Sequence, residues 1–402
     1  MSKVSNAIVI GGGIGGPVAA MALQRAGIEA TVYEAYQGVA DGVGGALSIA
    51  PNGRTALASI GAEAAVAAIG EPTHAMVMQS WTGKRLAEFG SPENLPGMLV
   101  VWRSDLYRAL YDEAARRGVR IEHGKRLVGL EDRGGRVTAR FADGGTATAD
   151  VLIGADGIRS TVRGLIDPAA PGPRYAGLLG FGARTGTEGL TSTNGKMHMV
   201  FGKRAFFGYQ VGGRDSGWFA NLPHPSPMSV TEAKAVGAAE WLRRLAEVFR
   251  DDRTPAADMI GRTRPEELVI TGGLEDIPSV PQWYRGRVVL IGDAAHATSP
   301  SSGQGASLAI ESGVQLARCL RDLPVEEAFA AYEGLRRERV ERIIKAAART
   351  NSDKAAGPVA RVLRDLIMPV AMRLLANPEK WAWQFDHPID FDAPVKPVAL
   401  TT

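Results

Sequence analysis

The stretch Ala7-Ile8-Val9-Ile10-Gly11-Gly12-Gly13-Ile14-Gly15-Gly16-Pro17 decides the fold of this 402-residue chain. An apolar run typical of a β-strand enters a glycine-rich turn, and an alanine-rich segment of helical character follows up to Gly27. A second apolar run then ends on Glu34. The order strand, glycine turn, helix, strand and acid predicts a unit that binds a dinucleotide, with the pyrophosphate at the helix N-terminus.

The glycines of this turn have separate roles in the predicted unit. Gly11 permits the tight turn, Gly13 lets backbone N–H groups approach the phosphates, and Gly16 lets the helix pack closely on the strand. Glu34 is placed to accept hydrogen bonds from a ribose, and its charge would repel a 2′-phosphate. The pattern therefore favours FAD or NAD over NADP.

The composition is ordinary for a soluble globular protein. Lys and Arg number 46 against 43 Asp and Glu, a net charge of +3, and no basic run is dense enough to indicate nucleic-acid binding. The single cysteine, Cys319, excludes an intramolecular disulfide and a Cys-based zinc site, and we expect it in the core. We find neither a basic-then-apolar leader nor an apolar run of about 18 residues, and we predict a cytoplasmic enzyme with no membrane span and no metal.

Two more glycine motifs follow strand-like apolar runs further along the chain. The first is Gly154-Ala155-Asp156-Gly157. The second is Gly292-Asp293-Ala294-Ala295-His296, which is followed by Pro300 and by Gly303-Gln304-Gly305 at the start of a helical segment. The free N–H groups of such a helix N-terminus favour an anion or a developing negative charge.

Strand-like stretches dominate residues 75–98 and 171–285 and predict an antiparallel sheet. These strands are rich in Met and aromatic residues, which fits either an ordinary core or the roof of an apolar ligand pocket. Helices are expected around residues 240–250 and 325–350. An apolar segment over 363–375 and an extended proline-containing tail from Asp386 follow.

The three glycine motifs, in this order and spacing, resemble those of the class A (single-component) FAD-dependent aromatic hydroxylases, which have the p-hydroxybenzoate hydroxylase fold. The resemblance extends from residue 7 to about residue 350, and residues 44–57 resemble the subgroup of tetracycline-inactivating and salicylate-hydroxylase-like enzymes. It implies an α/β chain with three parts. These are a discontinuous FAD-binding Rossmann-like domain of the glutathione-reductase type (1–74, 99–170 and 286–322), an inserted antiparallel-sheet substrate domain (75–98 and 171–285), and C-terminal helices with a tail (323–402).

The resemblance also implies which residues bind non-covalent FAD. They are Gly11, Gly13, Ile14, Gly15, Gly16, Glu34, Gly45, Ala46, Ser48, Arg103, Asp156, Asp293, Pro300, Gly303, Gly305 and Ala306. In relatives, the arginine similar to Arg103 contacts the phosphate region, Pro300 would lie beside the flavin ring, and the amides of Gly305 and Ala306 would stabilise negative charge on it. His296 is expected to be structural. Many relatives carry Asn where this chain has Ser307.

The implied reaction is oxygenation of an electron-rich small molecule. NAD(P)H, bound transiently, would reduce the flavin, dioxygen would form a C4a-hydroperoxide, and one oxygen atom would pass to an aromatic or polyketide-like substrate. Tyr209, His198 and His224 are the candidates for a general base, although each also fits a structural role. The residues proposed for the substrate pocket are Phe181, Met199, Phe207, Tyr209, Trp218 and Pro300.

Other functions share the same glycine motifs. A protein that binds FAD without catalysis, and a reductase of the same superfamily, would carry them unchanged. A flavin halogenase would add a Trp-x-Trp-x-Ile-Pro stretch, and Trp381-Ala382-Trp383 lacks that continuation. The sequence leaves open the substrate, the choice between NADH and NADPH, and whether the protein is a monomer or a homodimer.

Overall fold

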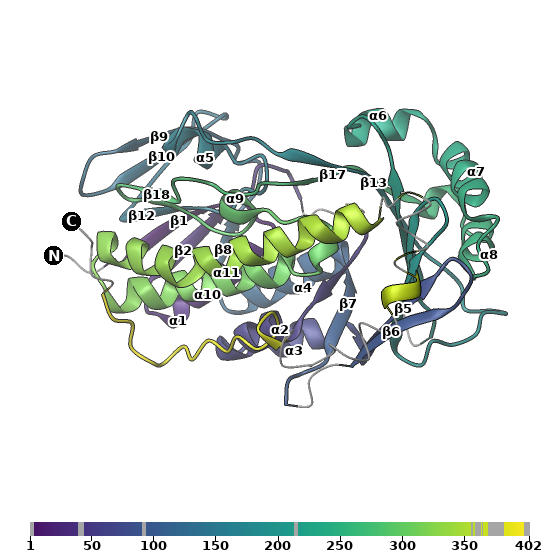
Figure 1. Cartoon of the computed structure of the whole chain (residues 1–402). Coiled ribbons are helices and arrows are strands. Elements are labelled where there is room, and N and C mark those ends of the chain that lie inside the picture. Colours follow the sequence, from purple (N-terminus) through teal and green to yellow (C-terminus); the bar gives the residue numbers. More distant parts are fainter. Residues whose placement is uncertain are drawn as a thin grey trace.

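The computed structural model describes residues 4–38, 44–90, 94–212, 216–354, 357, 363, 365–368 and 382–397. Two large sheets, with helices on each, account for most of the structure (Figure 1). The chain is therefore a mixed α/β protein, as predicted.

The first large sheet has six strands in the order β18-β19-β12-β1-β2-β8. All neighbouring pairs are parallel except β18 and β19 at one edge. The strands are β1 (Asn6–Ile10), β2 (Glu29–Tyr33), β8 (Arg120–Glu122), β12 (Val151–Gly154), β18 (Tyr284–Arg285) and β19 (Val288–Leu290). Strands β1 and β12 are almost entirely buried, as expected for parallel strands covered on both faces.

Helices cover this sheet. They are α1 (Gly15–Arg25), α4 (Arg103–Arg116), α5 (Thr161–Ile166), α9 (Asp293–His296), α10 (Gly305–Asp322) and α11 (Val325–Lys354). Helix α10 contributes more buried residues than any other of these helices, and it packs closely on α1, where a Cβ on Gly313 would lie 3.1 Å from the backbone of Ala19. Cys319 of α10 is buried in this core, as predicted.

The second large sheet has seven strands in the order β17-β13-β16-β15-β14-β5-β6. All pairs are antiparallel except β14 with β5. The strands are β5 (Ala75–Ser80), β6 (Arg85–Gly90), β13 (Arg174–Arg184), β14 (Lys196–Phe201), β15 (Phe206–Gln210), β16 (Gly217–Pro223) and β17 (Val269–Asp276). The sheet thus joins the two separate segments in which strand-like patterns were predicted. The domain boundaries themselves remain a proposal.

One face of the seven-stranded sheet is covered by three helices, at the right of Figure 1. They are α6 (Val230–Ala235), α7 (Ala238–Phe249) and α8 (Ala256–Gly261), followed by the short 3-10 helix η1 (Pro265–Glu267). Helix α7 matches the helix expected around residues 240–250.

Two three-stranded sheets complete the described strands, in the orders β11-β10-β9 and β3-β7-β4. Their strands are β3 (Ala46–Ile49), β4 (Glu71–Thr73), β7 (Met98–Trp102), β9 (Leu127–Asp132), β10 (Val137–Phe141) and β11 (Thr146–Ala149). Helices α2 (Pro51–Ser59) and α3 (Glu63–Ala67) follow β3, and the 3-10 helix η2 (Pro300–Ser302) precedes α10.

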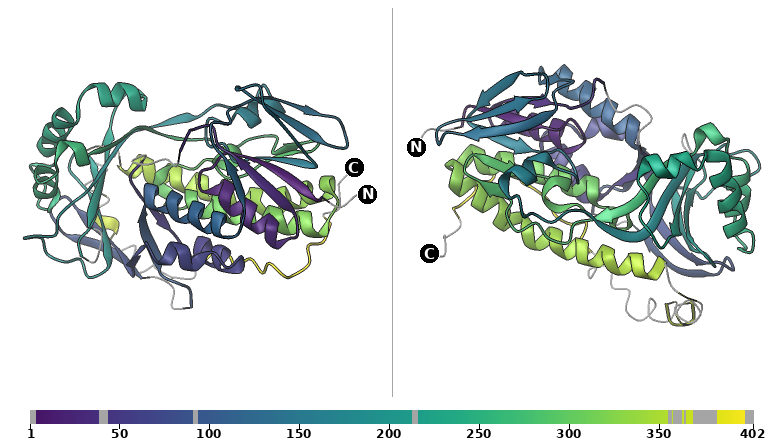
Figure 2. Two further views of the ribbon diagram at one scale, coloured as in Figure 1. Left: turned by 180° about the vertical axis from the view of Figure 1, so that it is seen from behind. Right: turned by 90° about the horizontal axis from the view of Figure 1, so that it is seen from above.

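Helix α11 runs beside α10 under the six-stranded sheet and reaches toward the seven-stranded sheet (Figures 1 and 2). It contains the helix expected over 325–350. Most of the apolar segment over 363–375 lies outside the described residues, as do residues 213–215 of a predicted turn. Among the described residues, no helix is long and apolar enough to span a membrane.

Candidate active site

The glycine turn after β1 has the close contacts that its sequence predicts. Gly11 has a φ of +105°, and a Cβ there would lie 2.5 Å from the carbonyl oxygen of Ala155. A Cβ on Gly16 would lie 1.9 Å from the carbonyl oxygen of Gly11. A side chain at either position would collide with backbone, so glycine is required for α1 to start directly above the end of β1.

Glu34, at the end of β2, is held rigidly beside this turn. Its Oε2 accepts the N–H of Gly12 at 2.6 Å, and its Oε1 accepts the N–H of Tyr36 at 2.9 Å. These charge-assisted hydrogen bonds keep the carboxylate at the position where a dinucleotide ribose would reach it.

Two tyrosines of α4 border the same turn. A Cβ on Gly12 would lie 1.9 Å from the Tyr111 hydroxyl, and the nearest atom to a Cβ on Gly13 is the Tyr107 hydroxyl at 3.9 Å. Burial, followed by the charge of Glu34, raises the pKa of Tyr111. Neither tyrosine is among the predicted site residues, although their spacing from Arg103 by four and eight residues puts all three on one helix face.

Arg103 and Asp293 approach Tyr107 from two other parts of the chain. Burial raises the pKa of Tyr107, the Arg103 charge opposes that rise, and Asp293 adds to it. The Asp293 side chain is accessible to solvent, yet desolvation by the surrounding protein raises the pKa of its carboxyl. The charges of Arg103 and Asp293 therefore both act on Tyr107, which borders the glycine turn, so these three residues gather beside that turn.

The paired glycines Gly44 and Gly45 both contact Arg103. A Cβ on Gly44 would lie 2.7 Å from Cδ of Arg103, and the N–H of Arg103 donates to the carbonyl of Gly45 at 3.2 Å. Strand β3, with Ala46 and Ser48, then pairs antiparallel with β7, which leads directly into α4. The segment predicted to approach the cofactor is therefore joined to Arg103 by backbone contacts.

The motif at Asp156 is an internal brace. Its Oδ1 accepts the Ser160 hydroxyl at 2.5 Å, and its Oδ2 accepts the N–H of Val162 at 3.0 Å, at the start of α5. From α5, Arg163 donates to the carbonyl of Ala294 at 3.0 Å. The motif around Asp156 is thereby connected by a hydrogen bond to the motif that contains Asp293.

The turn before α10 presents free backbone donors. Gly303 has a φ of +62°, and α10 begins two residues later at Gly305. Within the described residues, the N–H groups of Gly305 and Ala306 have no backbone or side-chain acceptor. The hydroxyl of Ser307 accepts the N–H of Ala50 at 3.0 Å, so this residue anchors α10 to the start of α2. The positive end of α10 is therefore open next to Pro300.

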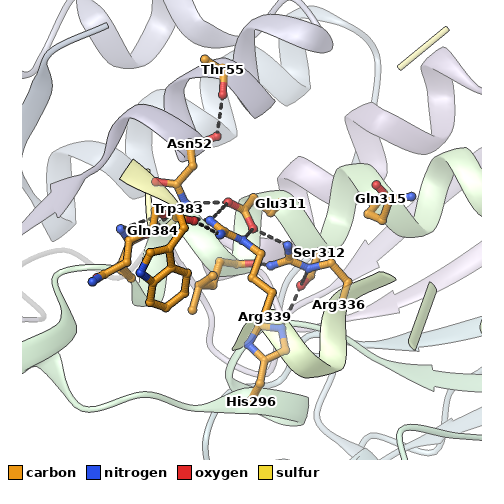
Figure 3. A network of polar contacts seen from close by, with 12 residues as sticks. Asn52, Thr55, His296, Glu311, Ser312, Gln315, Arg336, Arg339, Trp383 and Gln384 are labelled. Atoms are coloured by element: carbon orange, nitrogen blue, oxygen red, sulfur yellow. Dashed lines mark hydrogen bonds and ion pairs between the residues drawn. The ribbon is translucent and has the colours of Figure 1, made fainter. Parts of the chain in front are cut away.

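A buried ionic network holds α10 in place (Figure 3). Glu311 is fully buried and pairs with Arg336 of α11, with Arg339 at 3.0 Å, and with Nδ2 of Asn52 at 2.6 Å. Burial alone would raise the pKa of Glu311, but the two arginines lower it to about 2. The nearby His296 contacts the Ser312 hydroxyl at 2.8 Å, and burial lowers its pKa to about 3, so this histidine is neutral and structural.

The network also reaches the C-terminal segment. Arg339 donates to the carbonyl of Trp383 at 2.6 Å and to that of Gln384 at 2.8 Å. Arg336 occupies an inward position of α11 between Tyr332 and Val340, both fully buried. That spacing is the one sequence signal that could have marked Arg336 as a buried cation.

The residues proposed for the substrate pocket lie on both faces of the seven-stranded sheet. Phe207 and Trp218 stack 5.6 Å apart, and Phe207 contacts Phe249 of α7 at 5.3 Å. Phe181 contacts Trp241 of α7 at 4.8 Å. These side chains form the core between the sheet and α7 and α8, on the face turned away from Pro300, so we no longer place them in the pocket.

The candidates for a general base are on the same far face or beyond the strands. The Tyr209 hydroxyl contacts Nδ1 of His198 at 3.1 Å, and that nitrogen also lies 3.1 Å from Oε1 of Gln79. Burial raises the pKa of Tyr209 to about 12 and lowers that of His198. His224 contacts the carbonyl of Ser226 at 2.6 Å, in the loop after β16. None of the three is directed toward the turn at Pro300, which argues against each as the base.

The opposite face of the sheet carries a separate apolar cluster. It consists of Leu86, Phe201 and Phe206 with Met78, Met199, Phe219 and Met368 packed against it. Nζ of Lys354, at the end of α11, lies 4.1 Å from the Phe206 ring centre and donates to the Ser301 hydroxyl at 2.8 Å. This face and η2 therefore meet at Lys354, and Met199 and Pro300 are the two proposed pocket residues on this side.

Known proteins are similar to this chain over most of its length. A family model described as FAD binding domain matches residues 4–217 and 277–347. The 6-hydroxynicotinate 3-monooxygenase of Pseudomonas fluorescens is 33% identical over 358 residues, covering 85% of this chain and 90% of the relative.

Solved structures show the same fold. Klebsiella pneumoniae HpxO, complexed with FAD and uric acid, is 26% identical with a TM-score of 0.82, covering 92% of this chain and 95% of that one. The tetracycline destructase Tet(55) has a TM-score of 0.70 at 19% identity, covers 97% of this chain and 99% of that one, and shares the fold. The chain thus belongs to the family of the FAD binding domain and is an FAD-dependent monooxygenase of the class A aromatic hydroxylase type.

Proposed function

We propose that this protein uses NAD(P)H and dioxygen to hydroxylate, or otherwise oxygenate, an aromatic or polyketide-like small molecule. The observation that carries this proposal is the meeting of three features at one place. The open N-terminus of α10, the turn at Pro300, and the Met- and Phe-lined face of the seven-stranded sheet are joined there through Ser301 and Lys354.

The residues of this chain would hold and orient FAD. Glu34 would bind the ribose of the adenosine, the amides of the turn over 11–16 would bind the pyrophosphate, and Arg103 with Asp293 would hold the middle of the cofactor. When bound, FAD accepts a hydride from NAD(P)H and activates dioxygen for transfer of one oxygen atom. The amides of Gly305 and Ala306 would stabilise negative charge at the flavin end, since they occupy the positive end of α10.

The sheet face would exclude water from the reacting centre. Phe201 and Phe206 are buried and Met199 packs against them, which suits a planar apolar substrate. The relatives also support an aromatic substrate, because one is named for 6-hydroxynicotinate and another was solved with uric acid. No side chain is assigned as a general base, since the three candidates face elsewhere.

The experiment is to purify the protein, record its visible spectrum, and screen planar aromatic acids, phenols and polyketides for faster oxidation of NADH and of NADPH. Oxygen uptake and the mass of the product are measured together. We expect a yellow protein and a product heavier by one oxygen atom. A protein that remains colourless after reconstitution with FAD would contradict the proposal. So would a ligand that binds without stimulating NAD(P)H oxidation, which indicates sequestration, or turnover without oxygen uptake, which indicates a reductase.

Light scattering of the same sample would distinguish a monomer from a homodimer. Chloride or bromide in the assay, with a halogenated product, would indicate a halogenase instead.

A further inference from the structure

Lys354 occupies a polar position at the meeting point of the two large sheets. Its Nζ donates to Oδ1 of Asn221 on β16 at 2.7 Å and to the hydroxyl of Ser301 in η2 at 2.8 Å. The Phe206 ring on β15 lies 4.1 Å from the same nitrogen. One turn earlier in α11, Asn351 accepts the hydroxyl of Ser299 at 3.0 Å. The last described turn of α11 is therefore docked on the turn that contains Pro300.

Within the described part of the chain, no opposite charge balances this ammonium. No carboxylate among the described residues forms an ion pair with Lys354, and its two acceptors, an amide and a hydroxyl, are neutral. Two lysines at the seven-stranded sheet are paired instead. Lys196 of β14 lies 3.0 Å from Glu88, and Lys203, in the turn after β14, lies 3.3 Å from Asp251. Removing a lysine ammonium from water without a charged partner costs free energy, and an anionic ligand beside it would offset that cost.

The side chain of Lys354 is neither fully buried nor fully exposed. The side chain is partly accessible to solvent, while desolvation by the nearby protein lowers its pKa to about 7. The groups that face Nζ come from β15, β16 and η2, and they are Phe206, Asn221 and Ser301, none of which titrates near neutrality. Two of the three ammonium protons have acceptors in the described structure, so one remains to donate to a ligand.

We propose that Lys354 is a positioning residue that binds an acidic oxygen of the substrate, a carboxylate or an ionised ring hydroxyl, between Ser301 and the Met- and Phe-lined face of the sheet. The proposal rests on the proposed function, because it takes this face as the substrate site. It makes the substrate a planar aromatic acid rather than a neutral compound. The charge pair would hold the ring in one orientation beside Pro300.

The alternative is that Lys354 only joins α11 to the sheet through Asn221 and Ser301. A structural link of that kind would be indifferent to the charge of a bound ligand. The two roles therefore differ in how a substitution of Lys354 affects an acid and its neutral isostere.

The test measures binding to the FAD-loaded protein without NAD(P)H, by the change in flavin absorbance. Three matched pairs serve as probes: benzoate and benzamide, salicylate and salicylamide, and 6-hydroxynicotinate and 6-hydroxynicotinamide. The variants are Lys354→Met, which removes the charge, Lys354→Arg, which keeps it, and Lys345→Met, which removes an exposed lysine of the same helix. Thermal unfolding and FAD content are recorded for each.

We expect at least one acid to bind the unmodified protein more tightly than its amide. Lys354→Met should weaken the acid by about tenfold or more and the amide little, because a hydrogen bond to a charged group is lost. Lys354→Arg should retain most of the preference, and Lys345→Met should match the unmodified protein. Affinity for the acid should fall as the pH rises through about 7, where the ammonium of the free protein loses its proton.

Equal losses for an acid and its amide would overturn the proposal, and so would an unmodified protein to which none of the three acids binds. If Lys354→Met fails to fold, the unmodified protein decides by its preference between acid and amide and its pH dependence. Because no step requires turnover, a failure here is distinct from a failure of the oxygenase assay. An anion preference without oxygenation would show that Lys354 binds an anionic ligand but would contradict the proposed function, and that ligand would then not be a substrate for oxygenation.

Discussion

Replacement of Glu311 by Gln tests whether the buried network really fixes the helix that faces the flavin. The substitution keeps the size of the side chain and removes its charge. Arg336, which is fully buried, then loses its only carboxylate partner among the described residues, and Arg339 loses the same one. Breaking a buried ion pair in this way costs about 3–5 kcal/mol.

Glu333→Gln is the matched control. Glu333 also pairs with an arginine of α11, Arg337 at 2.6 Å, but both side chains are about a quarter exposed. Water can replace this partner, so the expected cost is about 0–1 kcal/mol. Both variants change one Glu to Gln. Glu311 is buried between two arginines, whereas Glu333 is partly exposed beside Arg337, which also pairs with Glu341.

The assay is equilibrium unfolding in urea at fixed excess FAD, followed by circular dichroism and by flavin fluorescence. Excess FAD keeps the contribution of cofactor binding to the stability comparable between variants. We expect a clear fall in the unfolding midpoint for Glu311→Gln and almost none for Glu333→Gln. Adding Arg336→Met to the first variant should restore part of the loss, because the unpaired charge is removed. Equal midpoints for the two single variants would refute the reasoning.

Three further outcomes are expected. The stability that Glu311 contributes is present above about pH 4.5 and is lost as the pH falls toward 2, because the pKa of Glu311 is lowered in the folded protein. Between pH 4.5 and 2 the free energy of unfolding should therefore fall more steeply in the unmodified protein than in Glu311→Gln. Parallel pH profiles for the two proteins would contradict this. Gly16→Ala should abolish FAD retention because its Cβ would lie 1.9 Å from a backbone oxygen, whereas Gly164→Ala, with no atom within 4 Å, should bind FAD normally in the same absorbance assay. Tyr209→Phe should leave kcat and KM within about twofold, since the Tyr209 hydroxyl contacts His198 on the face of the sheet that α7 covers. Phe219→Ala, on the opposite face, should raise KM by about tenfold. A larger effect of Tyr209→Phe than of Phe219→Ala would place the pocket on the face that α7 covers.

The parts of the site that follow from local backbone chemistry could be predicted from the sequence. Gly16 is predictable because a Cβ there would meet the carbonyl oxygen of Gly11, within the same turn. The tight turn at Gly11 is local too, since it needs a positive φ, but the close contact of Gly11 with Ala155 is not. Glu34 followed from the length of the same unit. The position of Tyr107 could also be predicted, since it follows Arg103 by four residues and so lies on the same face of the helix.

Other parts depend on contacts that no local pattern contains. Alternation assigns Phe206 and Phe207 to opposite faces of a strand, but it does not say which face meets α7 and which meets Lys354. The sequence alone therefore does not decide between Phe206 and Phe207 as a pocket residue. Lys354 reads as one cation of a basic helix, and its role appears only when Asn221 and Ser301, far away in the sequence, are brought to it.

The length of α11 has a geometric consequence. Lys354 follows Arg336 by 18 residues, which is five complete turns of an α-helix and a rise of about 27 Å. The two side chains therefore leave the helix in the same direction, one locked to Glu311 and the other directed at the sheet. Both the length of the helix and the number of its turns therefore fix where Lys354 is placed. Inserting one residue between them would turn Lys354 by about 100° away from Ser301, whereas an insertion of 18 would restore the direction and miss the distance.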